Sequence, residues 1–269
     1  MTAFAEVIGD PIAHSKSPLI HGFWLDALGI QAEYRRCHVR PDELAGYFEQ
    51  RRADRDWRGC NITVPHKEAA LAHVPDPGGI RHTIGAMNTV FRDESGGIAG
   101  TNTDAAGFWS PISALDLSGK PVVVIGAGGA ARAVLFALSR VGVGPVTILN
   151  RTPLKAAGLL AAFGLKGNVA PLGSALPPAA LLVNASTLGM AGQRALEVEL
   201  APLPDDAIVY DIVYAPLQTA LLQAAEHRGL ETIDGLEMLI GQAALAFELF
   251  FDAAPPRDRD DELRELLTA

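Results

Sequence analysis

Three polar clusters interrupt the ends of apolar, strand-like segments in the first half of the chain, where a purely structural core would carry no such groups. The first, HSKSP, places the hydroxyls of Ser15 and Ser17 at a helix start, where they could hold an anion such as a carboxylate. A serine that only caps the helix is the alternative interpretation. The second, NITVPHK, ends on Lys67, one of only five lysines in the chain, and the third joins Asn88 with Asp104. Taken singly, Lys67 would be a surface lysine and Asp104 a helix cap.

A glycine-rich turn in the second half could hold a dinucleotide. The β-branched run Val122–Ile125 is followed at once by GAGGAA and then by a helix-like segment, residues 132–140. One glycine would make the tight turn, another would let backbone N–H groups approach a pyrophosphate, and Ala131 would allow close packing of helix on strand. Glycine turns also simply connect strands to helices, but both flanking elements are of the required kind. We therefore expect cofactor contacts from Gly126, Ala127, Gly128, Gly129 and Ala130.

The residues after the next strand-like run indicate which dinucleotide is bound. NAD-selective folds usually place an Asp or Glu there, where it holds the ribose 2′-OH. This chain instead has NRT, and a guanidinium at that point can pair with a 2′-phosphate. A capped helix start with a solvated arginine is the alternative. We expect NADP rather than NAD, with contacts from Asn150, Arg151, Thr152 and Lys155.

Two kinds of segment surround these motifs. The first hundred residues alternate short strands with helices, one of them Ser17–Leu28 with Pro18 at its first position. From residue 121 onward, unbroken β-branched runs separated by helix-like material indicate buried parallel strands in a doubly wound α/β sheet. Strands are expected at residues 4–9, 33–39, 60–64, 86–91, 97–102, 122–125, 146–149, 181–183 and 208–210. Residues 235–269 are expected to be helical, ending in a solvated helix over 257–265.

Composition limits the remaining choices. The 269 residues are 49% hydrophobic, enough for a globular core, and the net charge of −9 argues against nucleic-acid or anionic-membrane partners. The two cysteines, Cys37 and Cys60, can form neither a disulfide framework nor a zinc cage, and no metal is expected. Neither a signal peptide nor an apolar run of roughly 18 residues is visible, so we expect a cytoplasmic protein.

Taken together and in order along nearly the whole chain, the motifs resemble the shikimate dehydrogenase family. The resemblance rests on VIGDP, HSKSP, NITVPHK, GAMNT, NTD, the glycine turn, NRT, DIVYAPL and DGLEML. It implies reversible, NADP-linked reduction of 3-dehydroshikimate to shikimate, on the way to chorismate and the aromatic amino acids. It also implies an α/β substrate domain, residues 1–104, a Rossmann-type NADP-binding domain, residues 105–238, and C-terminal helices, residues 239–269, that return to the substrate domain. The active site would lie in the cleft between the domains.

The resemblance further implies a role for each matched side chain. Lys67 and Asp104 would be the catalytic pair, and Ser15 and Ser17 would hold the substrate carboxylate. Elementary chemistry agrees, because ketone reduction puts negative charge on an oxygen that a lysine ammonium can stabilise and protonate. Further substrate contacts would come from Thr63, Asn88, Tyr214 and Gln242, and further cofactor contacts from Ile212 and Gly235.

Several positions depart from the family pattern. Gly22 stands where asparagine is usual, and Glu237 where glycine is commoner. The segment of residues 75–82 contains two prolines and two glycines, which cannot sustain the acidic helix usual there. An acidic residue on the nicotinamide side is therefore expected to be missing.

Two other functions stay open at this point. A quinate or quinate/shikimate dehydrogenase would share the fold and chemistry and differ in pocket size and one hydrogen bond. A dinucleotide-binding regulator that has lost catalysis would show decay at Lys67 or Asp104, and both are present. The partners expected are the small-molecule substrate and NADP, and the chain could be a monomer or a homodimer.

Overall fold

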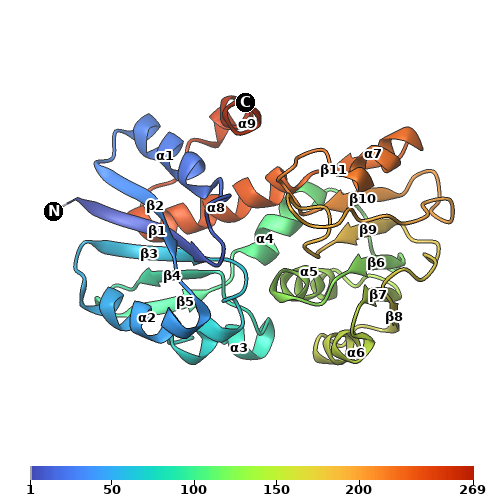
Figure 1. Ribbon diagram of the computed structural model, residues 1–269, viewed down its shortest axis with the longest axis horizontal. Coiled ribbons are helices and arrows are strands. Elements are labelled where there is room, and N and C mark those ends of the chain that lie inside the picture. Colours follow the sequence, from blue (N-terminus) through green and yellow to red (C-terminus); the bar gives the residue numbers. More distant parts are fainter. Residues whose placement is uncertain (1) are drawn as a thin grey trace. The chain divides into compact units, whose positions relative to one another are not determined.

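The computed structural model describes residues 2–269, which form two compact α/β units (Figure 1). Unit 1 contains the described residues up to Thr103 together with Ile240–Ala269. Unit 2 is Asp104–Leu239. Each unit has its own sheet, which confirms the predicted fold class.

Unit 1 is built on a five-stranded mixed sheet with the strand order β2-β1-β3-β4-β5. β1 pairs in parallel with β2 and β3, whereas β4 pairs antiparallel with β3 and β5. The strands that the sequence predicts all form, with ends shifted by a few residues. They are β1 (Ala3–Gly9), β2 (Ala32–His38), β3 (Trp57–Ile62), β4 (Thr89–Arg92) and β5 (Ile98–Thr101).

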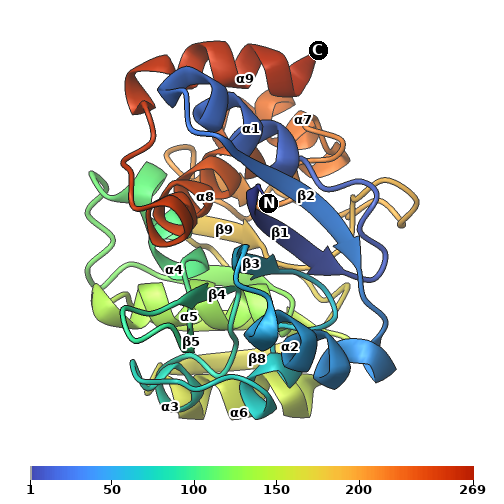
Figure 2. The same ribbon diagram turned by 90° about the vertical axis from the view of Figure 1, so that its left-hand side faces the viewer.

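Helices cover this sheet, with α2 and α1 well apart in the view of Figure 2. α2 (Leu44–Ala53) buries Leu44 and Phe48 in a core with the sheet residues Phe4 and Ile8. α1 (Ser17–Leu28) starts as predicted, with Pro18 in its first turn, and ends at Gly29 in the left-handed conformation. The short helices are η1 (Pro41–Glu43), η2 (Ala69–Ala72) and α3 (Ile80–Thr83).

The C-terminal helices belong to unit 1 from Ile240 onward. α8 (Gly235–Phe251) buries Phe247 against Trp24 of α1, with the ring centroids 5.5 Å apart. The turn η4 (Arg257–Arg259) leads into α9 (Asp260–Thr268), for which the sequence predicted a solvated helix. One face of α9 contradicts that prediction, because Leu263 and Leu267, four residues apart, are fully buried.

Unit 2 contains a six-stranded sheet with the order β11-β10-β9-β6-β7-β8, and every pairing is parallel. The chain starts at the centre, moves outward to β8 and returns to β9 beside β6, which is the doubly wound arrangement that binds dinucleotides at its switch point. The strands are β6 (Val122–Ile125), β7 (Val146–Asn150), β8 (Gly167–Pro171), β9 (Leu181–Asn184), β10 (Ile208–Asp211) and β11 (Glu231–Ile233).

The helices of unit 2 pack on this sheet. α7 (Ala220–His227) joins a core with Val123 of β6 and Val209 of β10. The predicted helix at residues 132–140 starts three residues earlier, at Gly129. The other helices are α4 (Asp104–Trp109), η3 (Ser110–Ile112), α5 (Gly129–Arg140) and α6 (Pro153–Ala162). Across residues 2–269, no helix is long and apolar enough to cross a membrane.

Candidate active site

Ser15 lies in the loop between β1 and α1, Ser17 is the first residue of α1, and both side chains are buried. The N-cap of α1 is Lys16, yet Ser15 acts as a cap from the preceding position, because its hydroxyl accepts from the first backbone N–H of the helix. Ser17 N donates to Ser15 Oγ at 3.3 Å. Arg36 of β2 fixes the loop from the side, because its Nε and Nη2 both donate to the Ser15 carbonyl oxygen, at 3.0 and 2.6 Å. Two hydroxyls are thus held in one place beside a guanidinium.

The turn after β3 carries Thr63 and Lys67. Thr63 N donates to Ile8 O at 2.9 Å, which keeps the turn beside the end of β1. Gly9 makes this approach feasible, since a Cβ there would lie 2.6 Å from Thr63 Cγ2. The Lys67 carbonyl accepts a hydrogen bond from Met87 N at 2.7 Å, so Lys67 is tied to the residue that precedes Asn88. Both Thr63 and Lys67 are half-buried.

A buried network surrounds Asn88 in unit 1. The Asn88 amide nitrogen donates to Thr103 Oγ1 at 2.9 Å and to Gln242 Oε1 at 3.3 Å. Its oxygen accepts from Thr103 N at 2.7 Å and from Thr89 Oγ1 at 3.1 Å. Gln242, on α8, is 154 positions from Asn88 along the chain. The fold therefore brings these two predicted substrate residues together and fixes which way the Asn88 amide faces.

Three further residues continue this network into the core, and none of them was among the predicted site residues. Asn61 Nδ2 donates to Thr89 Oγ1 at 3.1 Å, and Asn61 Oδ1 accepts from Tyr34 Oη at 2.7 Å. The Tyr34 ring stacks on His21, whose ring is fully buried. Burial lowers the pKa of His21 to about 3, because charging an enclosed imidazole loses its hydration. His21 is therefore neutral at ordinary pH.

In unit 2, the end of β6 and the start of α5 form the predicted dinucleotide turn. Gly126 has a φ of +111°, and a Cβ there would come 2.8 Å from the Ala185 carbonyl oxygen, so the position requires glycine. Gly128 is the N-cap of α5 and is exposed, while Gly129 and Ala130 are half-buried. The N-terminus of this 12-residue helix is thus partly exposed, and its first N–H groups form the positive end of the helix dipole.

The residues that follow β7, the strand next to β6 in the sheet, carry two positive charges. Asn150 Nδ2 donates to the Thr152 carbonyl oxygen at 3.0 Å, and α6 begins at Pro153. Arg151 and Lys155 are exposed at the N-terminus of α6. Cations at a helix N-terminus are unfavourable unless an anion offsets them, so this end of α6 is suited to a phosphate.

The loop after β10 is anchored by Asp211, which the sequence did not assign to the site. The buried carboxylate accepts hydrogen bonds from Asn184 Nδ2 at 2.8 Å, Val213 N at 3.0 Å and Thr219 Oγ1 at 2.7 Å. Burial raises the pKa of Asp211, and these three donors act in the opposite direction. The network thus ties the loop to the ends of β9 and β10.

This loop carries two of the predicted site residues. Ile212 and Tyr214 are both half-buried in it. A Cβ on Gly235 would come 2.4 Å from the Ile212 carbonyl oxygen, so Gly235 and Ile212, both expected to contact the cofactor, adjoin each other. Close backbone packing requires glycine at this position as well.

The predicted site residues divide between the units. Unit 1 holds the two serines, Thr63, Lys67, Asn88 and Gln242, whereas Asp104 is the first residue of unit 2 and of α4. The pairing of Lys67 with Asp104 stays a prediction. Within residues 2–269, no cluster of three or more His, Cys, Asp or Glu side chains could hold a metal ion.

The segment of residues 75–82 makes one helical turn rather than an acidic helix. Gly79 takes a φ of +68°, and α3 follows it directly. Asp76 accepts hydrogen bonds from the backbone N–H groups of Ile80 and Arg81, both at 2.7 Å. The one carboxylate of this segment is thus used to start the turn.

Family models match three stretches of the chain. Residues 7–90 match the shikimate dehydrogenase substrate binding domain. Residues 111–185 match the shikimate / quinate 5-dehydrogenase model, and residues 235–260 match the shikimate 5′-dehydrogenase C-terminal domain. The matches therefore cover parts of both units.

Individual proteins are similar over the whole length. The shikimate dehydrogenase (NADP(+)) of Sphingopyxis alaskensis is 70% identical, over 99% of this chain and 97% of that one. A crystal structure of shikimate 5-dehydrogenase from Thermus thermophilus in complex with NADP(H) and shikimate has a TM-score of 0.86 and 40% identity, covering 99% of this chain and 100% of that one. The quinate dehydrogenase of Corynebacterium glutamicum in complex with NAD has a TM-score of 0.84 and 29% identity, covering 98% and 99%.

Proposed function

The chain belongs to the shikimate dehydrogenase family, and we propose that it carries out the family's reaction with Lys67 and Asp104 as the acid–base pair. The activity is the reversible, NADPH-dependent reduction of 3-dehydroshikimate to shikimate, a step toward chorismate and the aromatic amino acids. The proposal for the site rests chiefly on the buried network that joins Asn88 to Gln242.

The residues of unit 2 fit NADP. The accessible N-terminus of α5 suits a pyrophosphate, and glycine at position 126 avoids a clash with the Ala185 carbonyl oxygen. Arg151 and Lys155 supply positive charge where a 2′-phosphate would need it. Ile212 and Gly235 would contact the nicotinamide end.

The residues of unit 1 suit a carboxylate with several ring hydroxyls. Ser15 and Ser17 would donate to the carboxylate, since Arg36 already fixes the backbone at Ser15. Asn88 and Gln242 bring amide donors and acceptors to this place, and a ring hydroxyl would replace one of the hydrogen bonds that Asn88 makes within the network. Thr63 and Tyr214 would add one hydroxyl each. Such a site would reject ligands that lack the matching hydroxyls, because its buried polar groups would lose their partners.

The proton is handled by the protein. When bound, NADPH supplies the hydride that reduces the ketone. Negative charge grows on the ketone oxygen, and the ammonium of Lys67 would stabilise it by a hydrogen bond and then donate the proton. In the oxidation direction the neutral amine of Lys67 would accept the hydroxyl proton. Asp104 would orient the lysine and accept a hydrogen bond from the hydroxyl.

Initial rates with shikimate or quinate, each paired with NADP⁺ or NAD⁺, test the substrate and cofactor. We expect strong preference for shikimate with NADP⁺. A preference for quinate or for NAD⁺ would keep the fold and reject the specificity argument. No turnover with any pair would favour the regulator that binds a dinucleotide without catalysis.

Substitution of the lysine tests the mechanism. Lys67→Ala should abolish turnover, while NADP⁺ binding, measured by fluorescence titration or calorimetry, stays as in the wild type because the cofactor residues lie in unit 2. Lys120→Met, at an exposed lysine, is the matched control and should retain full activity. Normal turnover of Lys67→Ala would refute the assignment.

The proposal also covers the partners, the compartment and the assembly of the enzyme. A net charge of −9 disfavours nucleic acid and anionic membranes as partners. We propose the cytoplasm as the compartment, since the two free cysteines, Cys37 and Cys60, fit a reducing environment, and either a monomer or a homodimer as the assembly. Activity in the soluble fraction of the source cell and a sedimentation measurement would test both points.

A further inference from the structure

Lys16 stands between the two serines of the proposed carboxylate site, yet its ammonium reaches a distant part of the chain. Its Nζ donates to the carbonyl oxygen of Leu267, which is 251 positions away, in the last turn of α9. The side chain is half-buried. A lysine at a helix C-terminus satisfies a free carbonyl and interacts favourably with the negative end of the helix dipole.

The side chains of α9 place negative charge at its N-terminal end and no positive charge in its last turn. Its first turn carries Asp260, Asp261 and Glu262, which suit the positive N-terminal end. Its last residues, ELLT, bring no cation of their own to the negative end. Lys16 supplies that charge from the loop before α1.

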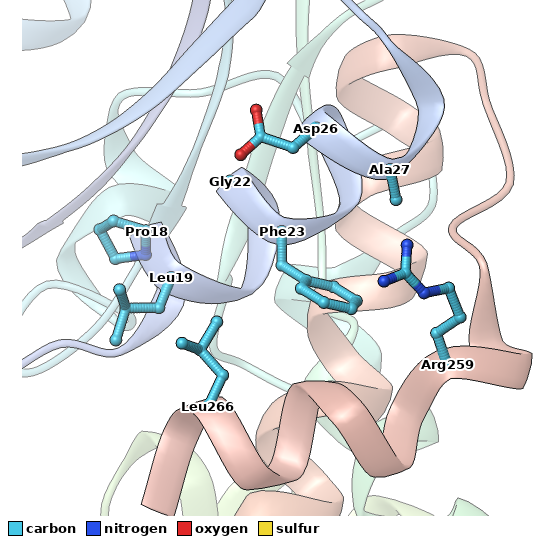
Figure 3. A pocket seen from close by; sticks show the side chains of 8 residues that line it. All are labelled: Pro18, Leu19, Gly22, Phe23, Asp26, Ala27, Arg259 and Leu266. Atoms are coloured by element: carbon cyan, nitrogen blue, oxygen red, sulfur yellow. The ribbon is translucent and has the colours of Figure 1, made fainter. Parts of the chain in front are cut away.

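The packing of α9 on α1 is incomplete, so the hydrogen bond from Lys16 to the Leu267 carbonyl oxygen matters more for holding α9 in place. Leu263 and Leu267 are buried, but a cavity of about 430 Å³ lies between the two helices (Figure 3). Leu266, which lines it, is 46% exposed. At the other end of α9, the guanidinium of Arg259 lies 4.8 Å from the ring centroid of Phe23. The helix is thus held by the buried Leu263 and Leu267 and by contacts at its two ends, with open space beside Leu266.

We propose that Lys16 is a positioning residue and that α9 is a strap which, through Lys16, fixes Ser15 and Ser17 for the substrate carboxylate. The inference rests on the proposed function, because it takes the two serines as the carboxylate site. The competing explanation is that Lys16 attracts the carboxylate directly by its charge. The two explanations differ in whether α9 matters.

The first test replaces the lysine. Lys16→Met should raise the KM for shikimate about tenfold and leave kcat at saturating shikimate and the KM for NADP⁺ unchanged. Lys16→Arg should restore the KM, because a guanidinium can also donate to the Leu267 carbonyl. Lys120→Met is the control for loss of one positive charge. An unchanged KM for shikimate in Lys16→Met would overturn the proposal.

The second test asks whether Lys16 acts through α9. Leu263→Ala, which loosens α9 from the core, should also raise the KM for shikimate. In the double variant, Lys16→Met should add little, because the tie is already ineffective. If the fold-increases in the KM for shikimate of the two single variants multiply in the double variant, Lys16 acts independently of α9. That result would favour direct attraction of the carboxylate and overturn the proposal.

Hydrogen exchange provides a readout that does not depend on the Leu263 variant. Binding energy shared between two sites is reciprocal, so saturating shikimate should slow exchange of the α9 amides in the wild type and not in Lys16→Met. Equal exchange of α9 with and without shikimate in the wild type would contradict the strap. The α6 amides, in unit 2, serve as the internal reference.

Failure of this inference can be told from failure of the proposed function. Ser15→Ala and Ser17→Ala should each raise the KM for shikimate if the serines hold the carboxylate. Unchanged KM values in both would refute the carboxylate site itself, and the strap with it. If the KM for shikimate rises in the serine variants but is unchanged in Lys16→Met, the strap alone is refuted.

Discussion

The imidazole of His21 lies flat against the phenol ring of Tyr34, with the ring centroids 3.9 Å apart and the planes at 2°. Trp24 and Phe247 close the cage around it, at centroid distances of 5.7 and 5.8 Å. Neither ring nitrogen has a hydrogen-bond partner among residues 2–269. The histidine therefore contributes its aromatic surface to the cage, whereas its nitrogens bear a desolvation cost.

The pH dependence of stability should reveal this histidine. The pKa of His21 is about 3 when folded, below its unfolded value of 6.5, so its stabilisation is complete above pH 6.5 and is lost as pH falls toward 3. The loss between pH 7 and pH 5 is about 2 kcal/mol. His21→Phe should remove this loss and keep the stack.

Urea unfolding at pH 7 and pH 5 measures both quantities. At pH 7 we expect His21→Phe to match or exceed the wild type by about 1 kcal/mol, because two unpaired nitrogens disappear. His82→Gln, at an exposed histidine, is the control and should leave the pH dependence unchanged. If His21→Phe kept the full loss toward pH 5, another group would be responsible.

A second prediction concerns Asp211, which receives three hydrogen bonds in the core of unit 2. Asp211→Ala should lower the free energy of unfolding by about 3 kcal/mol, because three donors lose their acceptor. Asp211→Asn keeps an acceptor oxygen and should cost less. Because burial raises the folded pKa of Asp211, the wild type loses part of its stability as pH rises through that pKa.

The asparagine variant lacks this titration. Its stability relative to the wild type should therefore improve from acidic to neutral pH, as measured by urea unfolding at several pH values. A relative stability that worsened on going to neutral pH would reverse the sign of the argument. An alanine variant as stable as the wild type would show that the network carries little energy.

The fold was predictable where one local pattern decides it. Val122–Ile125 has no polar alternation, and the turn that follows needs glycine, so strand, turn and helix follow from one stretch of sequence. β8 (Gly167–Pro171) and β11 (Glu231–Ile233) were missed because they lie at the sheet edges. Edge strands are covered on fewer sides, and GNVAP and ETI lack a continuous apolar run.

The site was predictable only in the parts that motifs carry. Asn88 and Lys67 stand in recognisable runs of polar residues at strand ends. Tyr34 and Asn61 are 27 positions apart, and nothing local in either segment predicts their hydrogen bond. The tie from Lys16 to α9 spans nearly the whole chain. Such contacts depend on tertiary packing, which neither periodicity nor spacing encodes.

A third prediction uses the close approach of Gly9 to Thr63. A Cβ at residue 9 would lie 2.6 Å from Thr63 Cγ2 and 3.1 Å from the Val64 carbonyl oxygen, so in Gly9→Ala the Thr63 side chain or the turn that carries it must shift. We expect the KM for shikimate to rise at least tenfold, with a loss of about 1–3 kcal/mol in the free energy of unfolding.

Gly46→Ala provides the matched control. Gly46 lies inside α2, is exposed, and has open space for a Cβ. The same chemical change there should stabilise the protein by about 0.5–1 kcal/mol and leave the KM unchanged. Kinetics and urea unfolding of both variants decide the point. Unaltered kinetics in a folded Gly9→Ala protein would show that the turn need not hold Thr63 so closely.

The last prediction concerns the cofactor and Arg151, which is exposed at the N-terminus of α6. Arg151→Asp replaces a partner of a 2′-phosphate with a group that repels it and that can accept a hydrogen bond from a 2′-OH. One charged hydrogen bond contributes about 1.5–3 kcal/mol, so the KM for NADP⁺ should rise roughly tenfold to a hundredfold while the KM for NAD⁺ falls or holds. The KM for shikimate should not move, because its proposed ligands on unit 1 are untouched.

Lys166→Asp, an identical charge change at another exposed site of unit 2, separates local pairing from the general field of the protein. A similar rise in both variants, weakening together as salt is added, would mean that net charge and not Arg151 selects the phosphate.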